Sequence, residues 1–121
     1  MTTNDQLKSI VDNLRSDVPE LRGVLIASSD GLAVAHSLSS GDANRVAAMV
    51  ATALGLGKRI CDSIGGGDLR ETSFAGATEQ VYVYAAGKRG VLGVLASSGC
   101  NVGLIHIEAR SAASKVQAVL G

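Results

Sequence analysis

The stretch GVLIASSDGLAVAH, residues 23–36, determines how the fold begins. It contains two short apolar runs, residues 23–28 and 32–36, with Ser29-Asp30-Gly31 between them. An Asp-Gly pair between two apolar runs is a strong signal for a β-hairpin, because glycine accepts the positive φ that such a turn requires. We therefore predict two antiparallel strands joined by a tight turn at Asp30-Gly31.

A helix is expected before this hairpin. Apolar residues recur there at helical spacing, at Leu7, Ile10, Val11 and Leu14. Thr3 and Gln6 have the spacing of a capping box, in which each side chain bonds the backbone N–H of the other residue. We expect an amphipathic helix that is capped by Thr3 and ends before Pro19.

A second helix is expected from about residue 43 to residue 64, with Asp42 as its N-cap. One of its stripes is apolar and consists of Val46, Val50, Ala53, Gly57, Ile60 and Ile64. A second stripe consists mostly of small residues: Arg45, Ala48, Thr52, Gly55 and Arg59. The helix therefore has two faces to bury. Because small residues let a second backbone approach closely, we interpret the second stripe as a contact with a helix of another subunit.

Three strands and a last helix are expected in the remaining sequence. Gly65-Gly66-Gly67-Asp68 ends the second helix, and strand-like runs follow at residues 69–74, 80–86 and 91–97. The short turns between these runs predict an antiparallel meander. Asn101 then opens a helix with apolar residues at helical spacing. The predicted order of elements is α-β-β-α-β-β-β-α.

These elements predict a single α+β domain, an α/β sandwich that spans residues 1–121. Its five-stranded antiparallel sheet carries helices on both faces, because every element has an apolar side to cover. The run 91–97 is apolar on both faces, as a central strand under helices needs to be. The run 69–74 is polar enough for an edge strand, and two such edges can pair across a two-fold axis.

Composition excludes several classes of function. Eleven Lys and Arg residues balance eleven Asp and Glu residues, so no net field attracts nucleic acid. The first five residues lack the features of a secretory signal, and we expect a cytoplasmic protein. The longest apolar stretch, residues 46–57, is too short to cross a bilayer, so we expect no membrane insertion.

Three segments together resemble one protein family. They are residues 24–32, residues 47–57 and the pattern from Val94 through Asn101 to Arg110. In order and spacing they resemble the roadblock/dynein light chain family, in the bacterial branch that includes MglB-like partners of Ras-like GTPases. The resemblance implies a roadblock fold similar to longin and profilin-like domains. It also implies a homodimer whose edge strands pair and whose middle helices form a platform for a small Ras-like, MglA-like GTPase, sometimes with a sensor kinase in the same pathway.

The candidate site is therefore an interface for a second copy or for a partner. Its residues lie on the middle helix and the edge strand: Arg45, Ala48, Met49, Thr52, Gly55, Leu56, Arg59, Leu69, Glu71, Thr72, Ser73 and Phe74. We expect a non-catalytic interaction protein, acting as a scaffold or as a GTPase-activating or other regulatory partner, without cofactor or metal. Exposed charges on the middle helix would tune association rate and specificity more than affinity.

Other kinds of site fit the sequence less well. The glycines at 65–67 follow a helix and lack the lysine of a phosphate-binding loop. A hydrolase built on His36 or His106 is an alternative, although the nucleophile-elbow motif is absent. Cys61 and Cys100 form no CxxC pair, and we expect both to be small buried hydrophobic residues. A second alternative is a small-ligand or sensory module with a pocket between the sheet and the middle helix.

Overall fold

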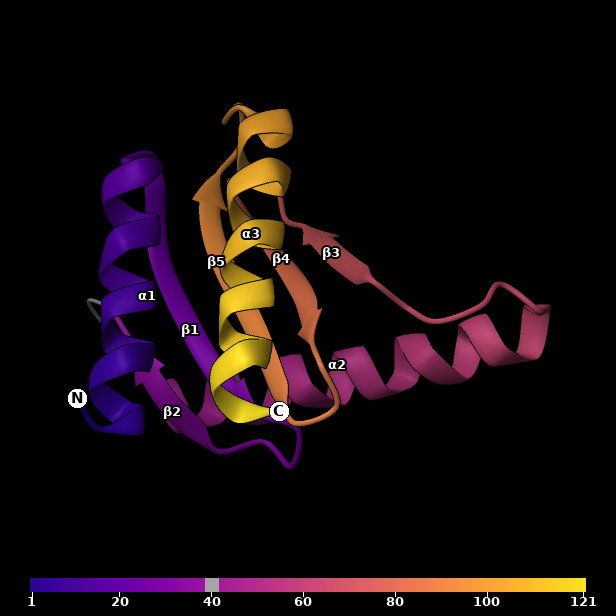
Figure 1. Ribbon diagram of the computed structural model, residues 1–121. Coiled ribbons are helices and arrows are strands. Elements are labelled where there is room, and N and C mark those ends of the chain that lie inside the picture. Colours follow the sequence, from indigo (N-terminus) through magenta and orange to yellow (C-terminus); the bar gives the residue numbers. More distant parts are fainter. Residues whose placement is uncertain (39–41) are drawn as a thin grey trace.

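The computed structural model describes residues 1–38 and 42–121 and contains three helices and five strands in the predicted order (Figure 1). The elements are α1 Thr3–Asp17, β1 Leu21–Ser28, β2 Ala33–His36, α2 Ala43–Ile64, β3 Glu71–Ala75, β4 Glu79–Ala86, β5 Gly90–Ser97 and α3 Val102–Leu120. All strand pairs are antiparallel, and the order across the sheet is β2-β1-β5-β4-β3. The predictions of a central β5 and of an edge strand near residues 69–74 are thus confirmed.

Helices cover both faces of the sheet, as expected. α1 and α3 pack side by side on one face, and α2 crosses the other (Figure 1). Side chains of β5 alternate between the two resulting cores, because successive residues of a strand point to opposite faces. Leu92 and Val94 belong to the core under α1 and α3, whereas Val91 belongs to the core under α2.

α2 is longer than the sheet is wide. We call the core that it covers the second core. α2 has 22 residues and is therefore about 33 Å long, whereas the four spacings between five strands span about 19 Å. Only the first part of α2 lies against the strands, and its C-terminal part extends past β3 (Figure 1). This overhang shapes the surface described below.

Turns and caps fix where the elements begin and end. Gly31 has φ +93°, as the predicted hairpin turn requires. The predicted capping box at Thr3 and Gln6 was wrong by one residue: Thr2 caps α1, and its hydroxyl accepts from the N–H of Asp5. An aspartate is as good a reciprocal partner as a glutamine here, because its carboxylate reaches the N–H of Thr2.

Two strands start two residues away from their predicted positions, and the other differences in strand bounds are of one residue. β1 starts at Leu21, two residues earlier than expected, because Leu21 pairs with Ala96 of β5. β3 starts at Glu71, so Leu69 precedes the strand and packs against the second core instead. Within the described residues, no helix is long and apolar enough to cross a membrane.

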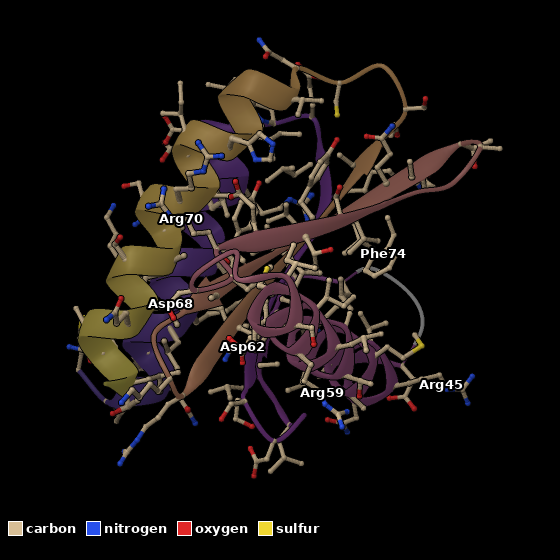
Figure 2. All side chains as sticks on the ribbon, turned by 90° about the vertical axis from the view of Figure 1, so that its right-hand side faces the viewer. Arg45, Arg59, Asp62, Asp68, Arg70 and Phe74 are labelled. Carbon is tan, nitrogen blue, oxygen red and sulfur yellow. The ribbon has the colours of Figure 1, made fainter. Side chains whose placement is uncertain are left out.

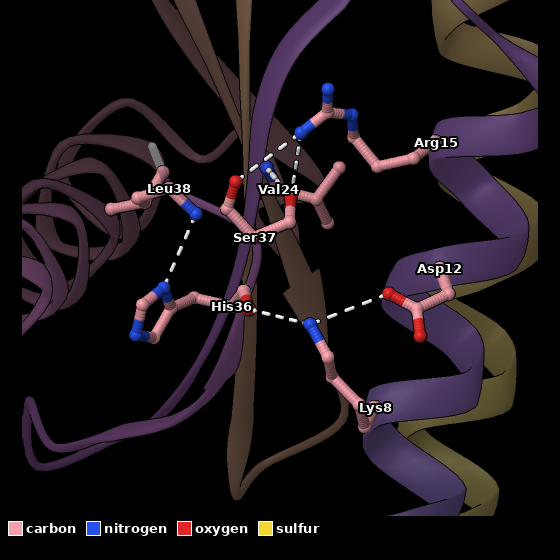
Figure 3. A network of polar contacts seen from close by, with 7 residues as sticks. All are labelled: Lys8, Asp12, Arg15, Val24, His36, Ser37 and Leu38. Carbon is pink, nitrogen blue, oxygen red and sulfur yellow. Dashed lines mark hydrogen bonds and ion pairs between the residues drawn. The ribbon is translucent and has the colours of Figure 1, made fainter. Parts of the chain in front are cut away.

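A polar network ties α1 to the end of β2 (Figure 3). The Arg15 guanidinium donates to the carbonyl and the hydroxyl oxygen of Ser37, each at 3.2 Å. The same hydroxyl oxygen accepts from the N–H of Val24 at 3.1 Å, and Lys8 donates to the carbonyl of His36. These bonds hold the chain where it leaves the sheet toward α2.

Candidate interaction surface

The outward side of α2 carries large apolar side chains that the chain does not cover. Met49, Leu56, Ile60 and Ile64 are each more than half exposed. Large apolar side chains gathered on one surface are typical of an interaction site. The apolar stripe predicted to be buried was therefore wrong at Ile60, which lies on a flank of the helix that faces away from the sheet, and at Ile64, the last residue of α2.

Helical geometry divides the exposed side of α2 into three rows. The buried centre consists of Ala47, Val50 and Leu54. At 100° per residue, the row opposite this centre is Arg45, Thr52 and Arg59, and we call it the outward row. The apolar row on one flank is Met49, Leu56 and Ile60, and the small-residue row on the other flank contains Ala48 and Gly55. Three kinds of surface thus lie next to one another on a single helix.

The two glycines near the middle of α2 have different surroundings. A Cβ atom at Gly57 would lie 2.7 Å from Cδ2 of Leu69, so this glycine makes room for the segment before β3. A Cβ atom at Gly55 would meet nothing within 4 Å. Glycine inside a helix costs about 1 kcal/mol relative to alanine. No contact within the described chain accounts for Gly55, whereas a second backbone approaching this row would.

The edge strand β3 adds an aromatic side chain to the same side of the molecule. Phe74 lies opposite Val81 of β4, and Thr72 lies opposite Val83. Cross-strand partners share a face, and Val83 belongs to the core under α2. Phe74 therefore projects on the α2 side and is 54% exposed, while Arg45 and Arg59 point away from the sheet (Figure 2).

Two other predicted interface residues of β3 project from the opposite face. Glu71 and Ser73 alternate with Thr72 and Phe74, so they lie on the side of α3. The Glu71 carboxylate accepts two hydrogen bonds from Arg110, one from Nε at 3.0 Å and a second from a terminal guanidinium nitrogen. The structure thus places Phe74 on the same face of the sheet as the predicted α2 residues but directs Glu71 into a contact within the chain.

Sequence reasoning did not identify this contact across the chain. Arg110 and His106 lie one turn apart on α3, and His106 Nδ1 lies 2.8 Å from the hydroxyl of Tyr84. The hydrogen bond from Arg110 lowers the pKa of the Glu71 carboxyl, and burial raises the pKa of the Tyr84 hydroxyl. The only available signal was the i, i+4 spacing of two polar residues on the last helix, which does not indicate a strand partner.

His36, Cys61 and Cys100 are the residues considered above for other kinds of site. His36 Nδ1 accepts from the N–H of Leu38 at 3.2 Å (Figure 3). Cys61 and Cys100 are free and half-buried, so the prediction that both are buried was wrong. Cys61 lies on the overhanging part of α2, where the sheet provides no cover.

An open groove of about 670 Å³ lies between α2, the end of β4 and α3. Its lining carries both signs of charge, with Lys58 and Arg70 near Asp62 and Asp68. A small-ligand pocket beside the middle helix was one of the alternatives, and this groove occupies a similar place. Mixed charges on exposed side chains do not select one class of ligand.

The arrangement of strands and helices shows the fold class of the protein. An open five-stranded antiparallel sheet, with two helices on one face and one helix crossing the other, is a profilin-like α+β domain. Profilin II of Acanthamoeba castellanii superposes with a TM-score of 0.68 at 15% identity, covering 93% of this chain and 97% of that one. The chain belongs to the Roadblock/LC7 domain family, whose model matches residues 7–96.

Relatives and solved structures agree with this assignment. An uncharacterized protein of Methanocaldococcus jannaschii is 36% identical over 100 residues, which are 82% of this chain and 87% of that protein. Myxococcus xanthus MglB has the same fold, with a TM-score of 0.86 at 18% identity over 96% of this chain and 88% of that one. An MglB with a tetrameric arrangement superposes with a TM-score of 0.89 at 15% identity, over 98% and 90% of the two chains.

Proposed function

We propose that this protein is a non-catalytic roadblock scaffold of the cytoplasm, which forms a homodimer and, as a dimer, binds and regulates a small Ras-like GTPase. The observation that carries the proposal is the uncovered apolar row Met49, Leu56 and Ile60 on α2, together with exposed Phe74 on the adjoining edge strand. The likeness to MglB supports the same conclusion, since one MglB is itself an assembly of several chains.

The overhang of α2 and the open edge of β3 are complementary features. If β3 pairs antiparallel with β3 of a second copy, the two sheets become continuous across a two-fold axis. The part of α2 that extends past β3 then lies under the sheet of the partner. In this arrangement the exposed apolar side chains of that part of α2, and Phe74, are buried between the two copies, and each of them contributes about 1.5–3 kcal/mol of stabilisation when fully covered.

The outward row remains available for a different partner. Arg45 and Arg59 point away from the sheet (Figure 2), and Thr52 lies in the same helical row, so the proposed dimer leaves this row exposed. Two such rows side by side form a broad surface whose guanidinium groups can bind carboxylates through bidentate hydrogen bonds. We assign this surface to the GTPase, in accord with the family resemblance. Its effect would come from repositioning the switch loops of the GTPase.

Light scattering tests the proposal directly. The mass of the purified protein is measured alone and then with Ras-like GTPases loaded with GDP or with a GTP analogue. We expect two chains for the protein alone and a larger complex with one nucleotide state. A monomer that ignores every GTPase would contradict the proposal.

Three substitutions separate the two parts of the surface. Leu56→Glu should produce a monomer, because it places a charge in the dimer contact. Ile107→Glu is the matched control, since Ile107 is equally exposed on a helix but lies on α3. Arg59→Glu should leave the dimer intact and weaken GTPase binding. A dimer that survives Leu56→Glu would show that this row has been assigned incorrectly.

A further inference from the structure

We propose that Arg110 of α3 sets the strength of self-association by holding the edge strand β3 in place through Glu71. This inference rests on the proposed pairing of β3 with a second copy. Arg110 is then a positioning residue, which acts on the dimer without touching the partner.

The strand that it holds has few other anchors. β3 has five residues, and among the described residues it pairs only with β4. Its last three residues are exposed, and the four residues that precede Leu69 are exposed as well. A short edge strand with so little burial opens at low free energy unless another contact restrains it.

The contact with Arg110 has the geometry of a strong restraint. Nε of Arg110 donates to one carboxylate oxygen of Glu71 at 3.0 Å, and a terminal nitrogen donates to the other oxygen. Such a bidentate pair fixes the relative orientation of the two side chains as well as the distance between them. The Glu71 side chain is only 24% exposed, whereas Arg110 is 57% exposed, so the restraint comes from the bidentate geometry of the pair and not from its burial.

The helix that supplies Arg110 is itself firmly placed. Ala109, Ala112, Ala113 and Val116 of α3 are buried in the core under α1 and α3. One turn before Arg110, His106 contacts the Tyr84 hydroxyl, and Tyr84 lies directly opposite Glu71 across the two strands. Two neighbouring residues of α3 therefore hold a cross-strand pair of β3 and β4. The position of β3 is fixed relative to the core.

A strand–strand interface depends on this position. Antiparallel pairing requires the N–H and C=O groups of the two edges to meet in register, so a displaced strand loses several hydrogen bonds together. Glu71 faces α3, while Phe74 faces the proposed contact. The Glu71–Arg110 pair thus links the α3 side of the sheet to the dimer edge.

The test compares dimer dissociation constants by analytical ultracentrifugation. Arg110→Met keeps the aliphatic stem but removes the charge, and Glu71→Gln keeps the shape but removes the carboxylate. Each should weaken the dimer about tenfold, and the double variant should be no weaker than either single one, because the two residues act as a unit. In hydrogen exchange on the monomer, the amides of β3 should exchange faster while those of α3 are unchanged.

Two controls separate positioning from general loss of stability. Asp12→Asn removes an ion pair on α1 and should leave the dissociation constant unchanged. Val116→Ala lowers the stability of the α3 core without touching the pair and should also leave it unchanged. A dimer weakened as much by Val116→Ala as by Arg110→Met would overturn the inference.

The remaining outcomes also distinguish this inference from the proposed function. A wild-type protein that stays monomeric at every concentration overturns both. A wild-type dimer whose affinity is unchanged by Glu71→Gln and by Arg110→Met overturns the inference alone. Because Glu71→Gln preserves side-chain size, it decides the question even if Arg110→Met fails to fold.

Discussion

Neighbouring side chains of β3 have different surroundings, because successive residues of a strand point to opposite faces of the sheet. Glu71 and Ser73 face the α3 side, whereas Thr72 and Phe74 face the α2 side. A shift of one residue in register would exchange these sets and would place the Glu71 carboxylate against apolar side chains. The bond between Glu71 and Arg110 therefore specifies the register of β3 as well as its position.

The pH dependence of stability should reveal this bond. Because Arg110 lowers the pKa of Glu71 in the folded chain, the ionised carboxylate stabilises the fold at pH values above its ordinary pKa of 4.5. That contribution is lost as the pH falls through the folded pKa. In urea unfolding, the wild type should exceed Glu71→Gln in stability at pH 7, and the difference should shrink below about pH 4. A difference that stays constant down to pH 3 would contradict this assignment.

At the scale of the element, α2 has residues with different surroundings. Ala47, Val50 and Leu54 pack on the sheet, whereas Ile60 and Ile64 are exposed. These residues belong to one continuous helix, which Asp42 caps at its N-terminus and Gly65, with φ +68°, ends. α2 extends past the sheet because it is long, not because the helix is broken.

Leu54 and Ile60 should respond differently to substitution by alanine. Leu54→Ala leaves a cavity in the core and should cost about 2–4 kcal/mol in unfolding free energy of the monomer. Ile60→Ala should change that free energy by less than about 0.5 kcal/mol, because the side chain is exposed. It should instead weaken the dimer. Urea unfolding at low protein concentration and ultracentrifugation at high concentration measure the two effects; an Ile60→Ala monomer as destabilised as Leu54→Ala would disprove the overhang.

Local patterns were sufficient for most elements of this fold. Asp30-Gly31, Asp42 and Asn101 marked a turn and two helix starts, because their backbone requirements depend on a few neighbouring residues. The exposure of Ile60 could not be read in the same way, since it depends on which side of the helix packs on the sheet and on how far the helix extends past it. The partner of Glu71 lies 39 positions away in the sequence, and no local pattern identifies it.

For the molecule as a whole, association has to come from shape and apolar area. Eleven positive and eleven negative residues cancel, so long-range attraction or repulsion between copies is small. Five large exposed apolar residues, Met49, Leu56, Ile60, Ile64 and Phe74, lie on α2 and β3, whereas Met1, Leu32, Val102 and Ile107 are exposed on other segments. The gathering of the five on two adjoining elements favours an interface there.

Thermal unfolding should therefore depend on protein concentration. A dimer that unfolds directly to separated chains gains about 1.4 kcal/mol for each tenfold increase in concentration, because dissociation is part of its unfolding. For an assembly of this size, the midpoint should rise by about 3–5 °C per tenfold increase. Phe74→Ser removes an exposed side chain at the proposed contact, so calorimetry should show a midpoint independent of concentration and close to that of the dilute wild type. If the wild-type midpoint itself is independent of concentration between micromolar and millimolar protein, the uncovered face of α2 and β3 does not bind a second copy.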